Sequence, residues 1–179
     1  MNMGIERIRR DVATEIEVIG PMEMEIRGGD KARQFIFRRV CGGVAYSFVI
    51  IETVFGIVIM GDYEPKDGPC TARKSVEWFA GENYPDYLAS HILERKFIKD
   101  KAIESLKEDA EYAQKDLQDE DYAKLCLETV SRLREVDTDY DALTILSEEF
   151  CELPGFGYDH HEVVKLYTIY TIFKEHFGG

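Results

Sequence analysis

The chain has 179 residues, of which 45% are hydrophobic and 32% are charged. This composition provides for a hydrophobic core and excludes a chain that is disordered throughout. No run of about 18 uninterrupted apolar residues occurs, which excludes a transmembrane helix, and the N-terminus has no apolar segment of the signal-peptide type. We therefore expect a cytoplasmic protein.

The formal net charge of −13 is concentrated in one half of the chain. Residues 1–80 contain 11 Lys and Arg against 12 Asp and Glu, whereas residues 81–179 contain 11 against 23. Nucleic-acid phosphates are bound by positively charged side chains, so direct binding of nucleic acid through the acidic second half is disfavoured. An acidic half of this kind favours solubility and docking to a basic protein surface.

The first 60 residues predict a helix followed by strands. Residues 4–18 place apolar side chains at helical spacing, and Gly20-Pro21 ends that helix. The period then changes to two, which predicts four strands separated by turns at Gly28-Gly29-Asp30 and Gly42-Gly43. These strands are expected at Met22–Arg27, Phe35–Val40, Tyr46–Thr53 and Phe55–Met60.

The remainder of the chain predicts a loop and then helices. Two prolines and a glycine make 63–70 the most irregular segment. Helices are expected over 75–80, from Asn83 onward with that residue as the cap, and over 98–118, 120–136, 137–153 and 159–173.

We therefore predict an α+β protein with an N-terminal helix on a four-stranded antiparallel meander, followed by a C-terminal helical bundle. Residues 1–97 are expected to form the α+β module and residues 98–179 the acidic helical module. Because no low-complexity linker separates them, the two modules could also form one joined domain.

Candidate catalytic residues are few. Asp159-His160-His161-Glu162 has the side chains for metal binding or acid–base chemistry, but the same residues fit a helix-capping box. The four cysteines, Cys41, Cys70, Cys126 and Cys151, are widely spaced and are read as free thiols, three of them buried, with Cys70 in the loop as the exposed candidate nucleophile. Phosphate-binding glycine motifs are absent. We expect no catalytic residue, no cofactor and no metal site.

The acidic helices give the strongest candidate site. Residues 99–162 contain 7 basic against 19 acidic side chains, a larger bias than a solubilising surface requires. Such carboxylates could occupy an Arg- and Lys-rich groove, as a nucleic-acid mimic does, although a merely soluble acidic surface is the alternative. The expected acidic face consists of Glu104, Glu108, Asp109, Glu111, Asp116, Asp119, Glu120 and Asp121.

Residues 5–97 resemble a family of small phage-encoded proteins. In that family an Arg-rich strand precedes an aromatic strand, a Gly-Asp turn and a helix with an aromatic pair. The matching segments are Phe35-Ile-Phe-Arg-Arg, Tyr46-Ser-Phe-Val-Ile-Ile-Glu-Thr, Ile57-Val-Ile-Met-Gly-Asp-Tyr, Val76-Glu-Trp-Phe and Asn83-Tyr-Pro-Asp-Tyr-Leu. The chain departs from the family pattern by an insertion at 64–70 and by its longer acidic helical extension.

The resemblance implies an accessory protein that acts in the host cytoplasm, for example an anti-CRISPR-like inhibitor bound to a basic, nucleic-acid-handling host effector. Two alternatives stay open. One is a small hydrolase or nucleotide-processing enzyme that uses His160 and His161. The other is a structural or regulatory phage protein that self-associates through exposed aromatic residues such as Tyr167 and Tyr170. We expect no direct nucleic-acid partner and no membrane partner.

Overall fold

The computed structural model describes residues 3–29, 32–43, 45–66, 68–81 and 83–177. The chain divides into two compact units. Residues 1–94 and 160–179 form the first, here called the sheet unit, and residues 95–159 form the second, the helical unit. Within the described ranges, no helix has both the length and the apolar character needed to cross a membrane.

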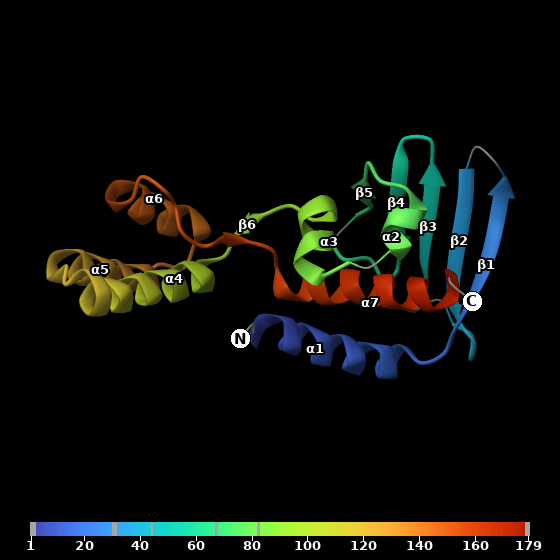
Figure 1. The fold of residues 1–179 in the computed structure, drawn as a ribbon, viewed down its shortest axis with the longest axis horizontal. Coiled ribbons are helices and arrows are strands. Elements are labelled where there is room, and N and C mark those ends of the chain that lie inside the picture. Colours follow the sequence, from blue (N-terminus) through green and yellow to red (C-terminus); the bar gives the residue numbers. More distant parts are fainter. Residues whose placement is uncertain (1–2, 30–31, 44, 67, 82, 178–179) are drawn as a thin grey trace. The chain divides into compact units, whose positions relative to one another are not determined.

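The sheet unit is built on an antiparallel meander in which the strands follow one another in chain order (Figure 1). The strands are β1 (Met22–Gly29), β2 (Ala32–Arg39), β3 (Phe48–Thr53), β4 (Gly56–Gly61) and β5 (Cys70–Ala72). The α+β class is confirmed, but the sheet has five strands instead of the predicted four. The sequence pattern misses β5 because three residues are too few to show an alternation.

Of the two predicted glycine turns, one is observed and the other lies partly outside the described residues. Gly42 and Gly43 follow β2 with φ angles of 81° and 95°, as the predicted turn requires. Gly28 and Gly29 instead end β1, and Asp30 lies outside the described residues.

One face of the sheet forms the aromatic core. Phe35 and Phe37 of β2 pair with Ile50 and Phe48 of β3, and all four side chains are buried. The side chains of Gln34 and Arg38, which point to the opposite face, are exposed. Ile36 lies on the same face as Gln34 and Arg38 but is buried, so the alternation accounts for the aromatic core of β2 and not for every buried residue.

Four helices belong to the sheet unit. They are α1 (Met3–Ile19), α2 (Val76–Ala80), α3 (Pro85–Ile92) and α7 (His160–Phe177). Helix α7 lies alongside α1 and also packs against α2 and α3 (Figure 1). The ring of Phe173 on α7 lies 5.3 Å from that of Phe35 and 5.6 Å from that of Phe79, measured between centroids. Helix α7 thus completes the core of the sheet.

This division of the chain differs from the predicted boundary between residues 97 and 98. That boundary assigns α7 to the acidic helical module, whereas α7 packs in the sheet unit. The amphipathic pattern of residues 159–173 predicts a buried helix face but carries no information on what covers it. The aromatic partners of α7 lie more than 90 residues away in the chain.

Two predictions about side chains in this unit are wrong. Asn83 does not cap α3, whose N-cap is Tyr84; its Nδ2 instead donates to Trp78 O at 2.9 Å, at the C-terminal end of α2. Tyr170 is buried, and its hydroxyl donates to Gly81 O at 2.7 Å, while half-buried Tyr167 donates to Asn83 O. These tyrosines hold α7 to the α2–α3 loop, and Tyr170 offers no surface for self-association.

The helical unit contains a short two-stranded sheet and three long helices. Its elements are β6 (Lys96–Phe97), α4 (Lys99–Tyr112), the π-helical turn η1 (Ala113–Leu117), α5 (Glu120–Glu135), α6 (Asp139–Glu149) and β7 (Phe156–Gly157). Strands β6 and β7 pair antiparallel and join the two ends of the unit. The π-turn ends at Gln118, which has a left-handed φ of 54°.

The core of the helical unit is made of small side chains. Five of the ten residues in its buried cluster are alanines, at positions 102, 110, 113, 123 and 142. Small side chains let helix backbones approach closely, but each contributes little apolar area. Leu106, Leu133 and Leu146 supply the larger buried groups.

Candidate acidic binding surface

Three glutamates of α4 form a stripe on the side of the helix that faces away from the core. Glu104, Glu108 and Glu111 are spaced four and three residues apart, so their side chains follow one another along a single face. All three are exposed, whereas Leu106 and Ala110 on the opposite side are buried. We call these three residues the glutamate stripe.

The other predicted acidic residues occupy different positions. Asp109 is half-buried, and its charge adds a small contribution to the rise in the pKa of the Tyr122 phenol, which is caused chiefly by burial. Asp119 is the N-cap of α5, where its Oδ1 accepts from Tyr122 N at 2.9 Å. Asp116 is exposed in η1, and Glu120 and Asp121 are exposed in the first turn of α5. The eight carboxylates therefore do not share one helix face.

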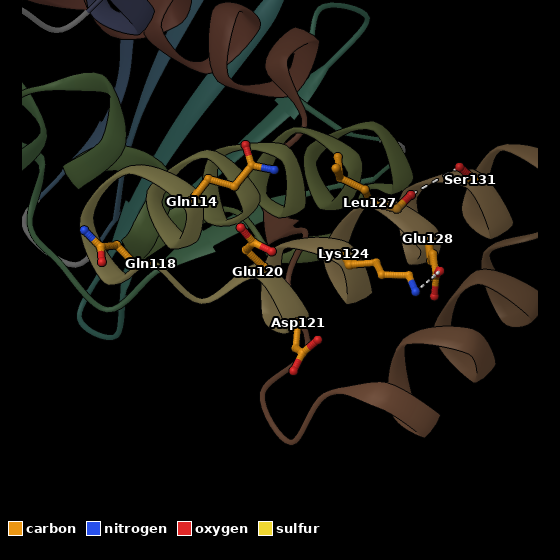
Figure 2. A pocket seen from close by; sticks show the side chains of 8 residues that line it. All are labelled: Gln114, Gln118, Glu120, Asp121, Lys124, Leu127, Glu128 and Ser131. Atoms are coloured by element: carbon orange, nitrogen blue, oxygen red, sulfur yellow. Dashed lines mark hydrogen bonds and ion pairs between the residues drawn. The ribbon is translucent and has the colours of Figure 1, made fainter.

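An open groove of about 880 Å³ lies where η1 leads into α5. Figure 2 shows the residues that line it, with Gln114 and Gln118 before the α5 N-terminus and Glu120 and Asp121 within the first turn. Lys124, Leu127, Glu128 and Ser131 continue the lining along α5. Two of the predicted acidic residues thus border a concave surface that carries amide and hydroxyl groups as well.

The cations at the start of the unit bind backbone carbonyls. Lys99 Nζ donates to Val136 O and Lys101 Nζ donates to Tyr158 O, each at 2.7 Å. Arg95 donates to Phe156 O at 2.8 Å. These three cations hold the ends of the unit together, and among the described residues none of them forms an ion pair with a carboxylate of α4.

Ion pairs neutralise only some of the acidic side chains. Arg132 binds two carboxylates, those of Glu148 at 2.9 Å and Glu149 at 2.7 Å. Lys115 binds Glu111 at 3.2 Å, and Lys124 lies 3.8 Å from Glu128. These side chains are in contact with water, which screens each pair and leaves it with little effect on stability.

Several predicted acidic residues have no ion-pair partner among the described residues. In the part of the chain that the structure describes, no cation lies within 4.0 Å of Glu104, Glu108, Asp116, Glu120 or Asp121. Over residues 95–159 the sequence contains 9 basic against 18 acidic side chains. The unit therefore presents unpaired carboxylates to its surroundings at neutral pH.

The structure offers no activated cysteine among the described residues. Cys70 is fully buried in β5, which contradicts its predicted exposure in a loop, and burial raises the pKa of its thiol. Burial likewise raises the pKa of the Cys126 thiol. Cys41 and Cys151 are exposed, so two thiols are buried instead of three. A raised pKa lowers the thiolate fraction, which makes a thiol less reactive.

The two adjacent histidines have different surroundings. His160 Nε2 lies 2.8 Å from Asp11 Oδ2, and this contact joins the start of α7 to α1 within the sheet unit. The hydrogen bond to His160 holds the pKa of Asp11 below its ordinary value. His161 is exposed. Among the described residues, no group of three or more His, Cys, Asp or Glu side chains is arranged to hold a metal ion.

The sequence reasoning missed the polar groups of the groove. Gln114, Gln118 and Ser131 have no periodicity or motif that marks them as neighbours, and they come together because the π-turn redirects the chain into α5. The π-turn ends at Gln118 in a left-handed conformation. Glycine or asparagine at this position would have indicated such a conformation in the sequence, but glutamine does not.

Comparisons with family models, with curated proteins and with solved structures found no match for this chain. The resemblance to small phage-encoded proteins therefore depends on the sequence motifs quoted above.

Proposed function

We propose that the protein is a phage-type anti-defence inhibitor, of the anti-CRISPR kind, that binds a basic, nucleic-acid-handling surface of a host effector in the host cytoplasm. Its helical unit supplies the binding surface, and no catalytic step is part of its action. The glutamate stripe and the acidic groove residues would take the place that nucleic-acid phosphates occupy on the effector.

The observation that carries this proposal is the unpaired state of the exposed carboxylates. Glu104 and Glu108 stand on the outer side of α4, and no described cation lies within 4.0 Å of either carboxylate, although Lys107 belongs to the same helix. The nearby Lys99 and Lys101 are bound to carbonyl oxygens instead. An exposed surface with charges of one sign attracts a partner of the opposite sign and accelerates the encounter.

The first experiment is a pull-down from bacterial lysate with the tagged full-length protein at low salt and at about 0.5 M salt, where exposed charges are strongly screened. We expect a protein with a basic nucleic-acid-binding groove to be captured at low salt and lost at high salt. The purified partner is then used to compare the wild-type protein with the double variant Glu104→Lys, Glu108→Lys by biolayer interferometry.

The double reversal removes two attractions and introduces two repulsions, so we expect affinity to fall about 10- to 100-fold, mainly through the association rate. Glu17→Lys is the matched control, because Glu17 is an exposed carboxylate on α1 with no described ion pair. Equal affinity of the wild-type and the double variant, or equal weakening by Glu17→Lys, would show that the glutamate stripe does not bind the partner.

A further inference from the structure

A cavity of about 560 Å³ opens on the sheet unit beside the β3–β4 hairpin and β5. Its lining includes three groups that carry or can carry positive charge: Arg73, Lys74 and His91. Hydroxyl groups of Thr71 and Ser90 also line it. No described Asp or Glu lines this cavity, although the chain contains 35 of these residues. A cavity of this size and polarity suits a small anionic ligand.

Arg73 and Lys74 differ from the nearby Arg33 in having no carboxylate partner among the described residues. Arg33, at the same end of the sheet, binds both Glu52 and Glu77. By contrast, no described carboxylate forms an ion pair with Arg73 or Lys74. A guanidinium and an ammonium without carboxylate partners, both in the lining of one cavity, suit a phosphate group, to which arginine can donate two hydrogen bonds at once.

Trp78 brings two of these groups together. Lys74 Nζ lies 5.6 Å from the centre of the indole ring, and the His91 ring lies 5.3 Å from it between centroids. His91 Nδ1 is in contact with Tyr87 O at 3.0 Å and with Ser90 Oγ at 3.1 Å. Nε2 is therefore the ring nitrogen that can bind a ligand in the cavity.

An exposed aromatic ring stands at the same cavity. Phe55 is 85% exposed at the tip of the β3–β4 hairpin, yet it belongs to the lining. The turn that carries it is fixed by Thr53, whose Oγ1 accepts from Phe55 N and donates to Gly56 O, each at 3.2 Å. A phenylalanine held in water on an ordered turn provides a flat apolar face on which a nucleobase can stack.

We propose that this cavity binds a nucleoside 5′-phosphate. Arg73 and Lys74 bind the phosphate, His91 adds a hydrogen bond through Nε2, and the base stacks on Phe55. The site is in the sheet unit and uses none of the carboxylates of the helical unit. If the cavity binds no nucleotide, the proposed inhibitor function is unaffected. If the acidic surface binds no host protein, the proposed nucleotide site is likewise unaffected.

The single tryptophan of the chain makes the test direct. Because Trp78 contacts Lys74 and His91, a ligand on these groups changes its fluorescence, which is excited at a wavelength where nucleotides do not absorb. The full-length protein is titrated with AMP, GMP, CMP and UMP, and calorimetry provides an independent dissociation constant. Adenosine and inorganic phosphate, titrated separately, test the two halves of the ligand.

We expect saturable binding of at least one nucleotide that is tighter than binding of inorganic phosphate or adenosine. Arg73→Gln should weaken it about tenfold or more, because a charge-assisted contact is lost. Arg9→Gln, an exposed arginine of α1 with no described ion pair, is the control for net charge and should change nothing. Phe55→Ser should weaken the binding of nucleotides but not that of phosphate, whereas Val54→Ser on the same turn should not.

Absence of saturable binding for all four nucleotides would overturn the proposal, as would an unchanged dissociation constant in Arg73→Gln. Inorganic phosphate that binds as tightly as the nucleotides would overturn the assignment of the nucleoside part. Circular dichroism of Arg73→Gln should match the wild type, since an exposed side chain without a partner does not contribute to the fold.

Discussion

The two units of this protein bury apolar side chains of different sizes. The sheet unit buries Phe35, Phe37, Phe48, Phe79 and Phe173 against one another, while half of the buried cluster of the helical unit is alanine. Larger side chains remove more apolar area from water and make more contacts. The sheet unit should therefore resist unfolding more strongly, and the helical unit combines a small core with a highly charged surface.

The aromatic core can be broken most directly at Phe173, which is fully buried and lies 5.0–6.0 Å from four other phenylalanine rings. Phe173→Ala should lower the free energy of unfolding by about 3–5 kcal/mol, because it leaves a cavity among rigid rings. Urea unfolding followed by Trp78 fluorescence measures the effect, and Phe55→Ala at the exposed hairpin tip is the control. A loss below about 1 kcal/mol would contradict the assignment of α7 to the core.

The close packing of the helical unit can be tested at Gly155, where the chain approaches α4. A Cβ at this position would lie 2.6 Å from the Cβ of Ala102, and the φ of 89° also disfavours an L side chain. Gly155→Ala should cost about 1–3 kcal/mol, seen as faster hydrogen exchange in α4.

Gly68→Ala separates the effect of backbone strain from the effect of the steric contact with Ala102. Gly68 has a φ of 113°, but a Cβ there would meet no atom within 4 Å. It reports backbone strain alone, so its cost should be smaller than that of Gly155→Ala. Equal effects of the two variants would show that the contact with Ala102 contributes nothing.

The rates at which the cysteines react with a thiol reagent compare the local stability of the two units. Each unit has one exposed and one buried thiol. Cys41 and Cys151 should react with Ellman's reagent at once, and Cys70 and Cys126 slowly. With Cys41→Ser and Cys151→Ser in place, Cys126 should react about tenfold faster than Cys70 because the alanine-rich unit opens more readily. Mass spectrometry of the labelled peptides assigns the two rates, and a faster Cys70 would reverse the expected order.

The smallest expected effect concerns the contact between α1 and α7. The pKa of Asp11 is lowered in the folded state, chiefly by its hydrogen bond to His160. A lowered carboxyl pKa stabilises the fold above the unfolded value of 3.8, and this stabilisation is lost as the pH falls through the folded pKa.

Asp11→Asn should therefore be less stable than the wild type at pH 5–6, and the two proteins should converge as the pH falls below 3.8 and through the lowered pKa of Asp11. Thermal unfolding across this range measures the difference. A difference that stays constant down to pH 2 would show that the ionised carboxylate is not what stabilises the pair.

Local patterns in the sequence determined much of this protein. The apolar spacing of residues 4–18 predicted α1, the pattern of Phe35–Val40 predicted β2, and the acidic run predicted a highly charged helical region. Each of these features depends on residues that lie within a few positions of one another, so a short window of sequence is sufficient to detect it.

The tertiary structure alone decided what those elements pack against. The pattern of α7 shows that one face is buried, but its partners Phe35 and Phe37 are distant in the chain. The same holds for the burial of Cys70 in a three-residue edge strand and for the presence of Arg73, Lys74 and His91 in the lining of one cavity. Such contacts are selected by the packing of the whole chain, because only the assembled core determines which partner covers each apolar face.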